Sequence, residues 1–211
     1  MDLIRKYFPC LARRQYHQFE KLLDLVPRLN QQVNIISRKD IPHLEEHHIL
    51  HSLSIAKQFE FGRGVSVIDA GTGGGFPGIP LAILFPDARF ILVDSIGKKI
   101  RMVREICQEL NLQNTGVIQA RIENLEITAE YVVSRAVAPF PTLVRWTQHL
   151  IRTGKERAGG DSHNAGGLIV LKGGELEGEL ERYMHLVELY PISTWFSESF
   201  FFSKTIVYLK K

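Results

Sequence analysis

The sequence predicts an α/β fold: a mostly parallel, seven-stranded sheet with helices on both faces. Three observations indicate this. Strand-like and helix-like segments alternate from residue 65 onward, which is typical of a parallel sheet. Near the C-terminus two strand-like segments follow one another with no helix between them, so an antiparallel hairpin should close the sheet. Residues 1–60 have helical patterns, so we expect a helical extension there and one α/β domain over residues 61–211.

The extension should contain two helices. Residues 11–33 place apolar side chains mostly at steps of three and four residues, the pattern of an amphipathic helix. Pro27 should kink this helix or end part of it, because proline lacks a backbone N–H. Pro42 introduces a second predicted helix over residues 43–59. We expect this extension to pack against the main domain.

The α/β domain should begin with a strand near residue 65. Apolar runs predict strands at 65–69, 89–94, 116–120, 131–134 and 168–171. Helices are predicted between or after them at 79–84, 98–110, 141–151 and 176–185. The closing hairpin is predicted at 192–196 and 205–209. The polar, glycine-rich segment 154–167 predicts a loop before the fifth strand.

The turn after the first predicted strand is the most informative feature of the chain. That strand ends in Asp69, and the glycines that follow it are Gly71, Gly73, Gly75 and Gly78. A strand, a glycine turn and a helix start in that order can form a nucleotide-type binding site. Glycine permits positive φ and lets the backbone approach a ligand closely. The free N–H groups at the helix start favour an anion.

Two classes of cofactor fit this turn. Gly73-x-Gly75-x-x-Gly78 matches the dinucleotide pattern, and a match of this kind alone is weak evidence. Asp69 stands where a carboxylate can meet the ammonium of a bound amino acid, which favours S-adenosylmethionine. Asp94 ends the second predicted strand, where an acid can accept both ribose hydroxyls, and this suits NAD equally well. A glycine turn without a ligand is the remaining alternative.

Composition excludes few classes of function. The 211 residues carry 26 Lys and Arg against 23 Asp and Glu, and this net charge of +3 permits a nucleic-acid partner without requiring one. Cys10 and Cys107 match no redox or zinc spacing. His47 and His51 have zinc-ligand spacing, but no third ligand is evident, so we expect no metal. The sequence has no apolar run of membrane-spanning length and no signal peptide.

The chain resembles the glucose-inhibited division protein B family, also called RsmG. The matching segments, in family order, are 68–82, Leu92-Val93-Asp94-Ser95 with Lys98-Lys99, Arg121-Ile122-Glu123, Ser134-Arg135-Ala136 and Leu171-Lys172-Gly173. The resemblance implies a Rossmann-like fold of an S-adenosylmethionine-dependent methyltransferase. It further implies methylation of guanine N7 in bacterial 16S ribosomal RNA, at guanosine 527. With the absence of a signal peptide, it implies a cytoplasmic protein, and a monomer is our default.

The resemblance also implies which residues hold the cofactor. They are Asp69, Gly71, Gly73, Gly75, Phe76, Asp94, Ile122, Glu123 and Arg135. Ile122 and Glu123 follow the third predicted strand and would lie beside the adenine, with an ordinary polar loop as the alternative. Arg135 ends the fourth predicted strand and would bind the cofactor carboxylate or an RNA phosphate. The alternative for Arg135 is a structural ion pair, for example with Asp69.

We expect no catalytic base. Guanine N7 carries a free lone pair, so no proton has to be removed before methyl transfer. The enzyme would act by aligning the target base with the cofactor, and proximity and orientation can lower the barrier substantially. The base would have to leave its stack to reach the pocket.

Contacts to the RNA are predicted at six positions: His48, Lys98, Arg101, Lys155, Arg157 and Lys172. A solvated helix face is the alternative for Lys98 and Arg101, and a solvated linker is the alternative for the loop with Lys155 and Arg157. The family motif Arg-His-x-x-Asp-Ser-Leu reads His47-His48-Ile49-Leu50-His51-Ser52-Leu53 here. The chain therefore departs from the family motif at His47 and His51. For His48 the alternative is a packed helix residue.

Other functions would need other features. A methyltransferase for another RNA is compatible with the same residues. An NAD-dependent oxidoreductase would need a catalytic acid such as a Tyr-Lys pair, which is not evident. A non-catalytic RNA-binding module would not need two strand-end acids on either side of a glycine turn.

Overall fold

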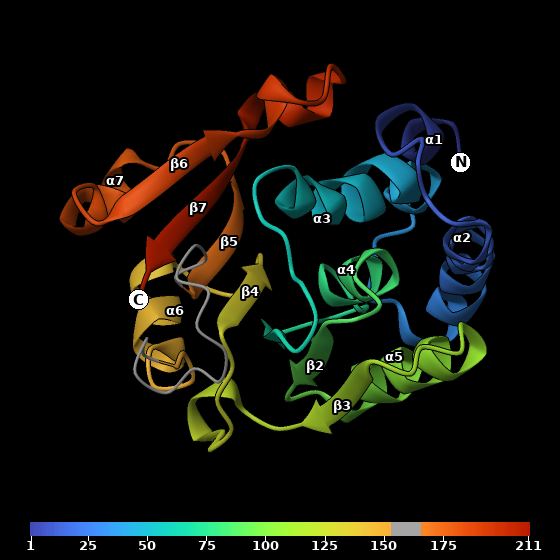
Figure 1. The fold of residues 1–211 in the computed structure, drawn as a ribbon, viewed down its shortest axis with the longest axis horizontal. Helices are drawn as coiled ribbons and strands as arrows, with labels where there is room; N and C mark the ends of the chain where they lie inside the picture. The colour runs from blue at the N-terminus through green and yellow to red at the C-terminus, as the bar shows by residue number, and fades with distance from the viewer. Residues whose placement is uncertain (153–165) are drawn as a thin grey trace.

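A seven-stranded sheet forms the centre of the molecule (Figure 1). The computed structural model describes residues 1–152 and 166–211. The strands are β1 (Ser66–Ala70), β2 (Arg89–Asp94), β3 (Thr115–Gln119), β4 (Tyr131–Arg135), β5 (Gly167–Gly173), β6 (Val187–Pro191) and β7 (Lys204–Lys210). Their order across the sheet is β3-β2-β1-β4-β5-β7-β6.

The first five strands run parallel, and β7 runs antiparallel to both of its neighbours. From β1 the chain first builds outward through β2 to β3, and it then returns to place β4 on the other side of β1. The strand order therefore reverses between β1 and β4. Ligands of open α/β sheets gather at such a reversal, outside the carboxyl ends of the strands.

Helices cover both faces of the sheet, as predicted. On one face, α4 (Gly78–Leu84) and α5 (Gly97–Glu109) share a buried cluster with alternate residues of β1 and β2. On the other face, α6 (Phe140–Thr147) and α7 (Glu177–Leu180) bury apolar side chains with the remaining alternate residues. Because both faces are covered, β1 and β2 are almost entirely buried, which explains their unbroken apolar runs.

The N-terminal extension packs on the face that carries α4 and α5. It consists of α1 (Asp2–Tyr7), α2 (Arg13–Val33) and an irregular helical run, which comprises Ile41–His43, Leu44–Leu50, α3 (His51–Leu53) and Ser54–Lys57. The long helix does not end at Pro27, which lies inside it. Its apolar side chains on either side of that proline are buried against the main domain, so tertiary packing holds the helix together.

The closing hairpin forms, but its first strand differs from the prediction. The strand lies at Val187–Pro191, whereas the predicted segment 192–196 begins with the short helical turn Ile192–Thr194. The prediction followed the apolar residues Ile192 and Phe196, which are buried in the turn rather than in the sheet. β6 is an edge strand with exposed side chains, so it lacks the apolar run that marks the inner strands.

Two helices are shorter than predicted. α6 ends at Thr147, because Leu150 and Ile151 turn back and Ile151 pairs with Ala129 in an isolated bridge. α7 gives way at Glu181–Tyr183 to a tighter helical turn. None of the helices in the described residues is long and apolar enough to span a bilayer.

Candidate functional site

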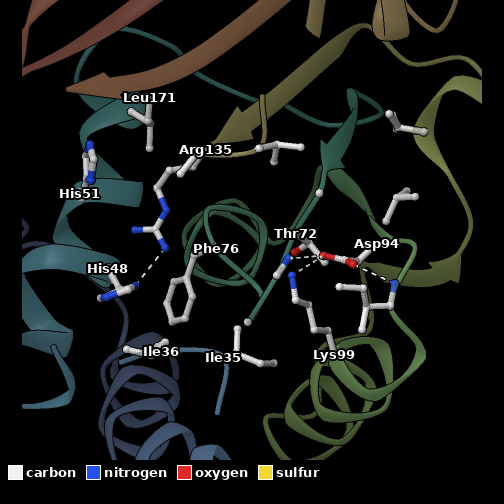
Figure 2. Close-up of a pocket in the computed structure, with 18 of the residues that line it drawn as sticks. Ile35, Ile36, His48, His51, Thr72, Phe76, Asp94, Lys99, Arg135 and Leu171 are labelled. Atoms are coloured by element: carbon white, nitrogen blue, oxygen red, sulfur yellow. Dashed lines mark hydrogen bonds and ion pairs between the residues drawn. The ribbon is translucent and has the colours of Figure 1, made fainter. Parts of the chain in front are cut away.

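A cleft of about 760 Å³ opens where the strand order reverses. Its floor is the glycine turn between β1 and α4. One side comes from the segments that follow β2 and β3, and the other side from the ends of β4 and β5. The extension contributes a further wall with Ile35, Ile36, Asp40 and three histidines. Phe200, just before β7, and Lys204, the first residue of β7, complete the lining. Figure 2 labels side chains around the cleft from the extension, the glycine turn, the ends of β2, β4 and β5, and α5.

The glycine turn needs glycine for two different reasons. Gly71, Gly73 and Gly75 all have positive φ, the conformation that side-chain-bearing residues rarely adopt. At Gly71 a Cβ would also collide with Val137, whereas at Gly73 it would meet only the Gly71 carbonyl oxygen, 3.9 Å away. Gly73 therefore leaves open space in the cleft, which a ligand can fill at close range to the backbone.

Asp69 lies at the end of β1, fully buried beneath the turn. Its Oδ2 accepts hydrogen bonds from the Thr72 hydroxyl at 2.6 Å and from the Gly78 N–H at 2.8 Å. Its Oδ1 has no hydrogen-bond partner among the described residues. Burial raises the pKa of Asp69 to about 6. A buried carboxylate oxygen without a donor is costly in a folded protein. Asp69 is not among the residues that line the cleft, so a donor from a ligand would have to approach this oxygen through the turn above it.

Asp94 lies at the end of β2, one strand away, and is 7% exposed. Its carboxylate accepts hydrogen bonds from the Gly73 N–H at 3.1 Å and the Ile96 N–H at 2.9 Å. The Lys99 ammonium lies 3.5 Å from its Oδ2 (Figure 2). Each carboxylate oxygen has a second lone pair, so Asp94 can hold the glycine turn and still accept hydroxyl groups from a ligand.

The loop after β3 completes the wall beside Asp94. Ala120, Arg121, Ile122 and Glu123 line the cleft, and Ile122–Asn124 form a short helical turn. Ile122 is buried and presents an apolar surface, while Arg121 pairs with Glu123 at 3.7 Å. The loop thus combines an apolar contact with backbone polar groups, which suits a flat heterocycle such as adenine.

Arg135 ends β4 on the far side of the cleft from Asp94 (Figure 2). Its Nη1 donates to the His47 carbonyl oxygen at 3.0 Å, and its Nη2 donates to Nδ1 of His48 at 2.9 Å. Its guanidinium also lies over the Phe76 ring, 5.4 Å from the centroid. Burial lowers the pKa of Arg135 to about 10, so the group stays charged at neutral pH. No carboxylate of the described residues lies within ion-pair distance, including the Asp69 considered from the sequence.

Asp40 holds the two histidines of the extension that contact Arg135. Its carboxylate accepts from Nε2 of His48 at 2.5 Å and from Nδ1 of His47 at 2.6 Å. Because a carboxylate only accepts and a guanidinium only donates, His48 carries its proton on Nε2 and a lone pair on Nδ1. Burial and the nearby Arg135 lower the pKa of His48 to about 4, so the imidazole is neutral. Both ring nitrogens of this predicted RNA contact are thus already engaged within the chain.

His51, the second departure from the family motif, is 5% exposed. Its ring packs edge-on against Phe200, 5.5 Å away, and Phe201, 6.2 Å away, between centroids. Burial lowers its pKa well below the usual value, so the ring is neutral. An uncharged aromatic side chain fits these ring contacts, but its buried Nε2 has no hydrogen-bond partner among the described residues.

The other predicted RNA contacts do not lie together in the structure. Lys172 lines the cleft, but its ammonium pairs with Glu179 at 2.5 Å and donates to the Ala138 carbonyl at 3.1 Å. Lys98 and Arg101 are exposed on α5 and do not line the cleft. The predictions for Lys155 and Arg157 lie outside the described residues.

Sequence reasoning missed Asp40, Phe200 and Lys204, all of which line the cleft. No local pattern marks them, because each comes from a segment far along the chain from the glycine turn. The one available signal was the pair of histidines in the departing motif, which the fold brings against Asp40 and Phe200. Among the described residues no three His, Cys, Asp or Glu side chains are arranged to hold a metal ion.

Comparison with known proteins gives one consistent result. A family model described as rRNA small subunit methyltransferase G matches residues 15–188. A Phocaeicola vulgatus protein named Ribosomal RNA small subunit methyltransferase G is 47% identical over 211 residues, covering 99% of this chain and 98% of the relative. Its namesake from Christiangramia forsetii is 46% identical over 209 residues, covering 99% of this chain and 96% of the relative.

Solved structures share the fold at low sequence identity. An S-adenosylmethionine-dependent O-methyltransferase from Thermotoga maritima aligns with a TM-score of 0.58 at 12% identity, over 81% of this chain and 69% of its own. An S-adenosylmethionine-dependent methyltransferase from Aquifex aeolicus aligns with a TM-score of 0.54 at 15% identity, over 82% of this chain and 98% of its own. These likenesses confirm the predicted fold class.

Proposed function

The chain belongs to the rRNA small subunit methyltransferase G family, and from that membership we propose that it transfers a methyl group from S-adenosylmethionine to N7 of a guanine in 16S ribosomal RNA, the family's guanosine 527. Membership in this family argues against the two alternative functions considered from the sequence, an oxidoreductase and a non-catalytic RNA-binding module. The proposal concerns the identity of the cofactor, the base and the residues that hold them.

The observation that carries the proposal is the buried Oδ1 of Asp69, which has no hydrogen-bond partner among the described residues and lies beneath a glycine turn that opens to the cleft. S-adenosylmethionine brings an ammonium group on its methionine part, which can supply the missing donor. NAD has no such ammonium group. The chemistry of the residues present therefore fits S-adenosylmethionine better than a dinucleotide.

The remaining residues can be assigned from one end of the cleft to the other. Ile122 and Glu123 would hold the adenine, and Asp94 would accept the ribose hydroxyls. Gly71, Gly73 and Gly75 would lie against the middle of the cofactor, with Asp69 at its ammonium. Arg135 would bind the carboxylate of the methionine part, because a partly buried guanidinium without a carboxylate partner favours an anionic ligand. Phe76 supports Arg135 through its ring face.

The reaction asks the protein for alignment rather than proton transfer. The cofactor supplies a methyl carbon made electrophilic by its sulfonium sulfur. Guanine N7 has a free lone pair, so we assign no general base. The chain's own part is to orient the base at the cleft, to exclude water from it and to keep cations away from the ring that becomes positive. Arg135 meets that last condition, because His47, His48 and Phe76 hold its guanidinium in place.

The substrate and its setting follow from the same premise. We expect either the naked 16S RNA or a small-subunit particle to be the partner, in the bacterial cytoplasm, with the enzyme acting as a monomer. Size-exclusion chromatography with light scattering checks the monomer.

The decisive experiment maps the product. The purified protein is incubated with S-adenosylmethionine labelled on the methyl carbon and with 16S RNA or small subunits that lack the modification. We expect label in one guanosine, in a form that piperidine cleavage after reduction identifies as 7-methylguanosine. Label in another base or another RNA would contradict the proposed target. Excess NAD should leave transfer unchanged, and inhibition by NAD would contradict the cofactor assignment.

A further inference from the structure

A column of three parallel rings rises beside the cleft. The His43 and His47 rings stack with centroids 4.6 Å apart and 15° between their planes. The His47 and Phe200 rings stack at 3.9 Å and 14°. The two histidines come from the helical run of the extension, whereas Phe200 precedes β7, and these segments lie side by side in Figure 1. Two parts of the chain more than 150 residues apart thus build one stack.

The column links the cleft to the surface. Phe200 and His47 line the cleft, while His43, at the other end, is exposed and does not. The His47 carbonyl accepts a hydrogen bond from Arg135, the residue proposed to bind the cofactor carboxylate. One ring of the column therefore belongs to a direct neighbour of the proposed cofactor site. One face of the terminal His43 ring stacks on His47, and the residue is exposed to solvent.

Lys204 adds a positive charge to this column. Four other cations of the cleft have polar partners: Lys99 with Asp94, Arg121 with Glu123, Arg135 with His48 and Lys172 with Glu179. Lys204 lies over the Phe200 ring, 4.7 Å from the centroid, and has neither a hydrogen bond nor an ion pair within residues 1–152 and 166–211. It crosses the space that a side chain at position 173 would fill, and Gly173 leaves this space free.

We propose that this column, capped by His43 and flanked by Lys204, is a subsite for an unpaired nucleotide next to the target guanine. The base of that nucleotide stacks on His43, and a phosphate of the same strand pairs with Lys204. The inference deepens the proposed function and rests on it, since it assumes an RNA substrate. It assigns a binding role to residues that lie outside the proposed cofactor site.

Single-stranded RNA is the ligand that matches both features. Bases splayed out of a helix are recognised by stacking on aromatic side chains, and every base offers a flat face for this. A base within a duplex is already stacked, so the subsite favours a loop or bulge over a paired region. A free ammonium close to the rings supplies the electrostatic contact to the backbone that accompanies such stacking. A target that must leave its own stack would be held in position by its neighbour.

The test compares variants of the exposed ring. His43→Ala removes the stacking face, His43→Trp restores an aromatic face, and His43→Leu keeps apolar bulk without one. His17→Ala is the matched control, because His17 is an exposed histidine on α2 that does not line the cleft. The probe is a fluorescent RNA hairpin carrying the target guanine and its unpaired neighbours, and a second hairpin has abasic sites in place of those neighbours.

We expect His43→Ala to weaken binding of the intact hairpin about 5- to 150-fold, the range that base–aromatic stacking supports. His43→Trp should bind like the wild type, whereas His43→Leu should resemble the alanine variant. On the abasic hairpin all four variants should bind like the wild type. Lys204→Ala should lower the salt dependence of binding by up to about one unit of log–log slope. Melting temperature and cofactor affinity of His43→Ala should remain those of the wild type, which separates the subsite from a packing role.

Other results overturn the inference. If His43→Ala binds the intact hairpin as well as the wild type does, the column is internal packing. The same holds if the loss persists on the abasic hairpin, because the ring would then not contact those bases. Methyl transfer to 16S RNA or small subunits separates the two proposals. Ring-dependent hairpin binding without such transfer contradicts the proposed function and leaves the subsite, whereas transfer without ring-dependent hairpin binding contradicts the subsite and leaves the proposed function. A wild-type protein that binds neither hairpin contradicts the subsite.

Discussion

The two oxygens of Asp69 have different environments, and that difference has a consequence for pH. Oδ2 stabilises the turn through Thr72 and Gly78, while Oδ1 has no partner among the described residues. Burial therefore outweighs the two hydrogen bonds and raises the pKa of the carboxyl from 3.8 to about 6. Below about pH 6 the folded protein therefore holds a proton on Asp69 that an ammonium-bearing ligand must displace.

We expect cofactor affinity to rise with pH through about 6, the folded pKa of Asp69. Below that value binding should weaken by up to about tenfold per pH unit, because the protonated acid cannot pair with the ammonium. Isothermal titration between pH 5 and 8 measures this. Asp69→Asn should bind weakly at every pH with a flat profile, and a wild-type profile that is equally flat would contradict the assignment.

Without cofactor, the same group affects folding in the opposite direction. A carboxyl whose folded pKa is raised contributes stability that is full below its unfolded pKa of 3.8 and is lost as the pH rises through about 6. Added cofactor should reverse this trend between pH 5 and 7. Thermal melts at a series of pH values, with and without cofactor, check the sign.

Arg135→Lys tests the contact at the other end of the methionine part. Lysine keeps the charge but lacks the planar fork that now bridges the His47 carbonyl and the His48 ring. We expect single-turnover methyl transfer to fall by at least about tenfold, equivalent to about 1.4 kcal/mol. A melting curve gives the control, since both present partners of the fork are uncharged. Normal turnover in a destabilised protein would make Arg135 a structural residue.

At the scale of elements, the turn between β1 and α4 can be tested apart from backbone strain. Gly73→Val places a β-branched side chain at φ 59° and into open cleft space, so we expect cofactor binding to be lost. Gly64→Val is the matched control: Gly64 has φ 82° and no atom within 4 Å of a new Cβ, and it precedes β1 at the other end of that strand. Equal cofactor affinity in the two variants, measured by calorimetry, would move the cofactor away from the turn.

The elements also show what the sequence could predict. β1 and β2 were predictable because burial on both faces demands apolar runs. Asp69, next to last in β1, and Asp94, last in β2, stand out as acids near strand ends. β6 was misplaced because an edge strand needs no such run. Phe200 and Lys204 could not be predicted as cleft residues, since their role depends on the antiparallel return of the chain to the extension. The contact between Asp40 and His48 is instead local to the extension and depends on its irregular helical run, which replaces the single helix predicted over residues 43–59.

At the scale of the whole molecule, the extension and the sheet share one buried cluster. Phe19 and Leu22 of α2, Leu53 of α3, Leu81 of α4 and Phe90 of β2 all belong to it. The extension also supplies one wall of the cleft, with Ile35, Ile36 and Asp40. A ligand in that cleft therefore contacts both parts of the chain, and the boundary predicted near residue 60 stays a prediction about folding units.

Phe19→Ala tests whether that boundary separates units of folding. Phe19 is fully buried, and truncation of a buried phenylalanine costs about 3–5 kcal/mol. If the shared cluster makes the protein one cooperative unit, urea unfolding followed by circular dichroism and by tryptophan fluorescence should give one coincident transition, shifted to lower urea in the variant. Trp146 reports from the cleft wall. Cofactor at 100 times its dissociation constant should restore about 2.7 kcal/mol to that single transition. Two transitions, of which Phe19→Ala shifts one and the cofactor the other, would show instead that the extension folds separately from the domain it covers.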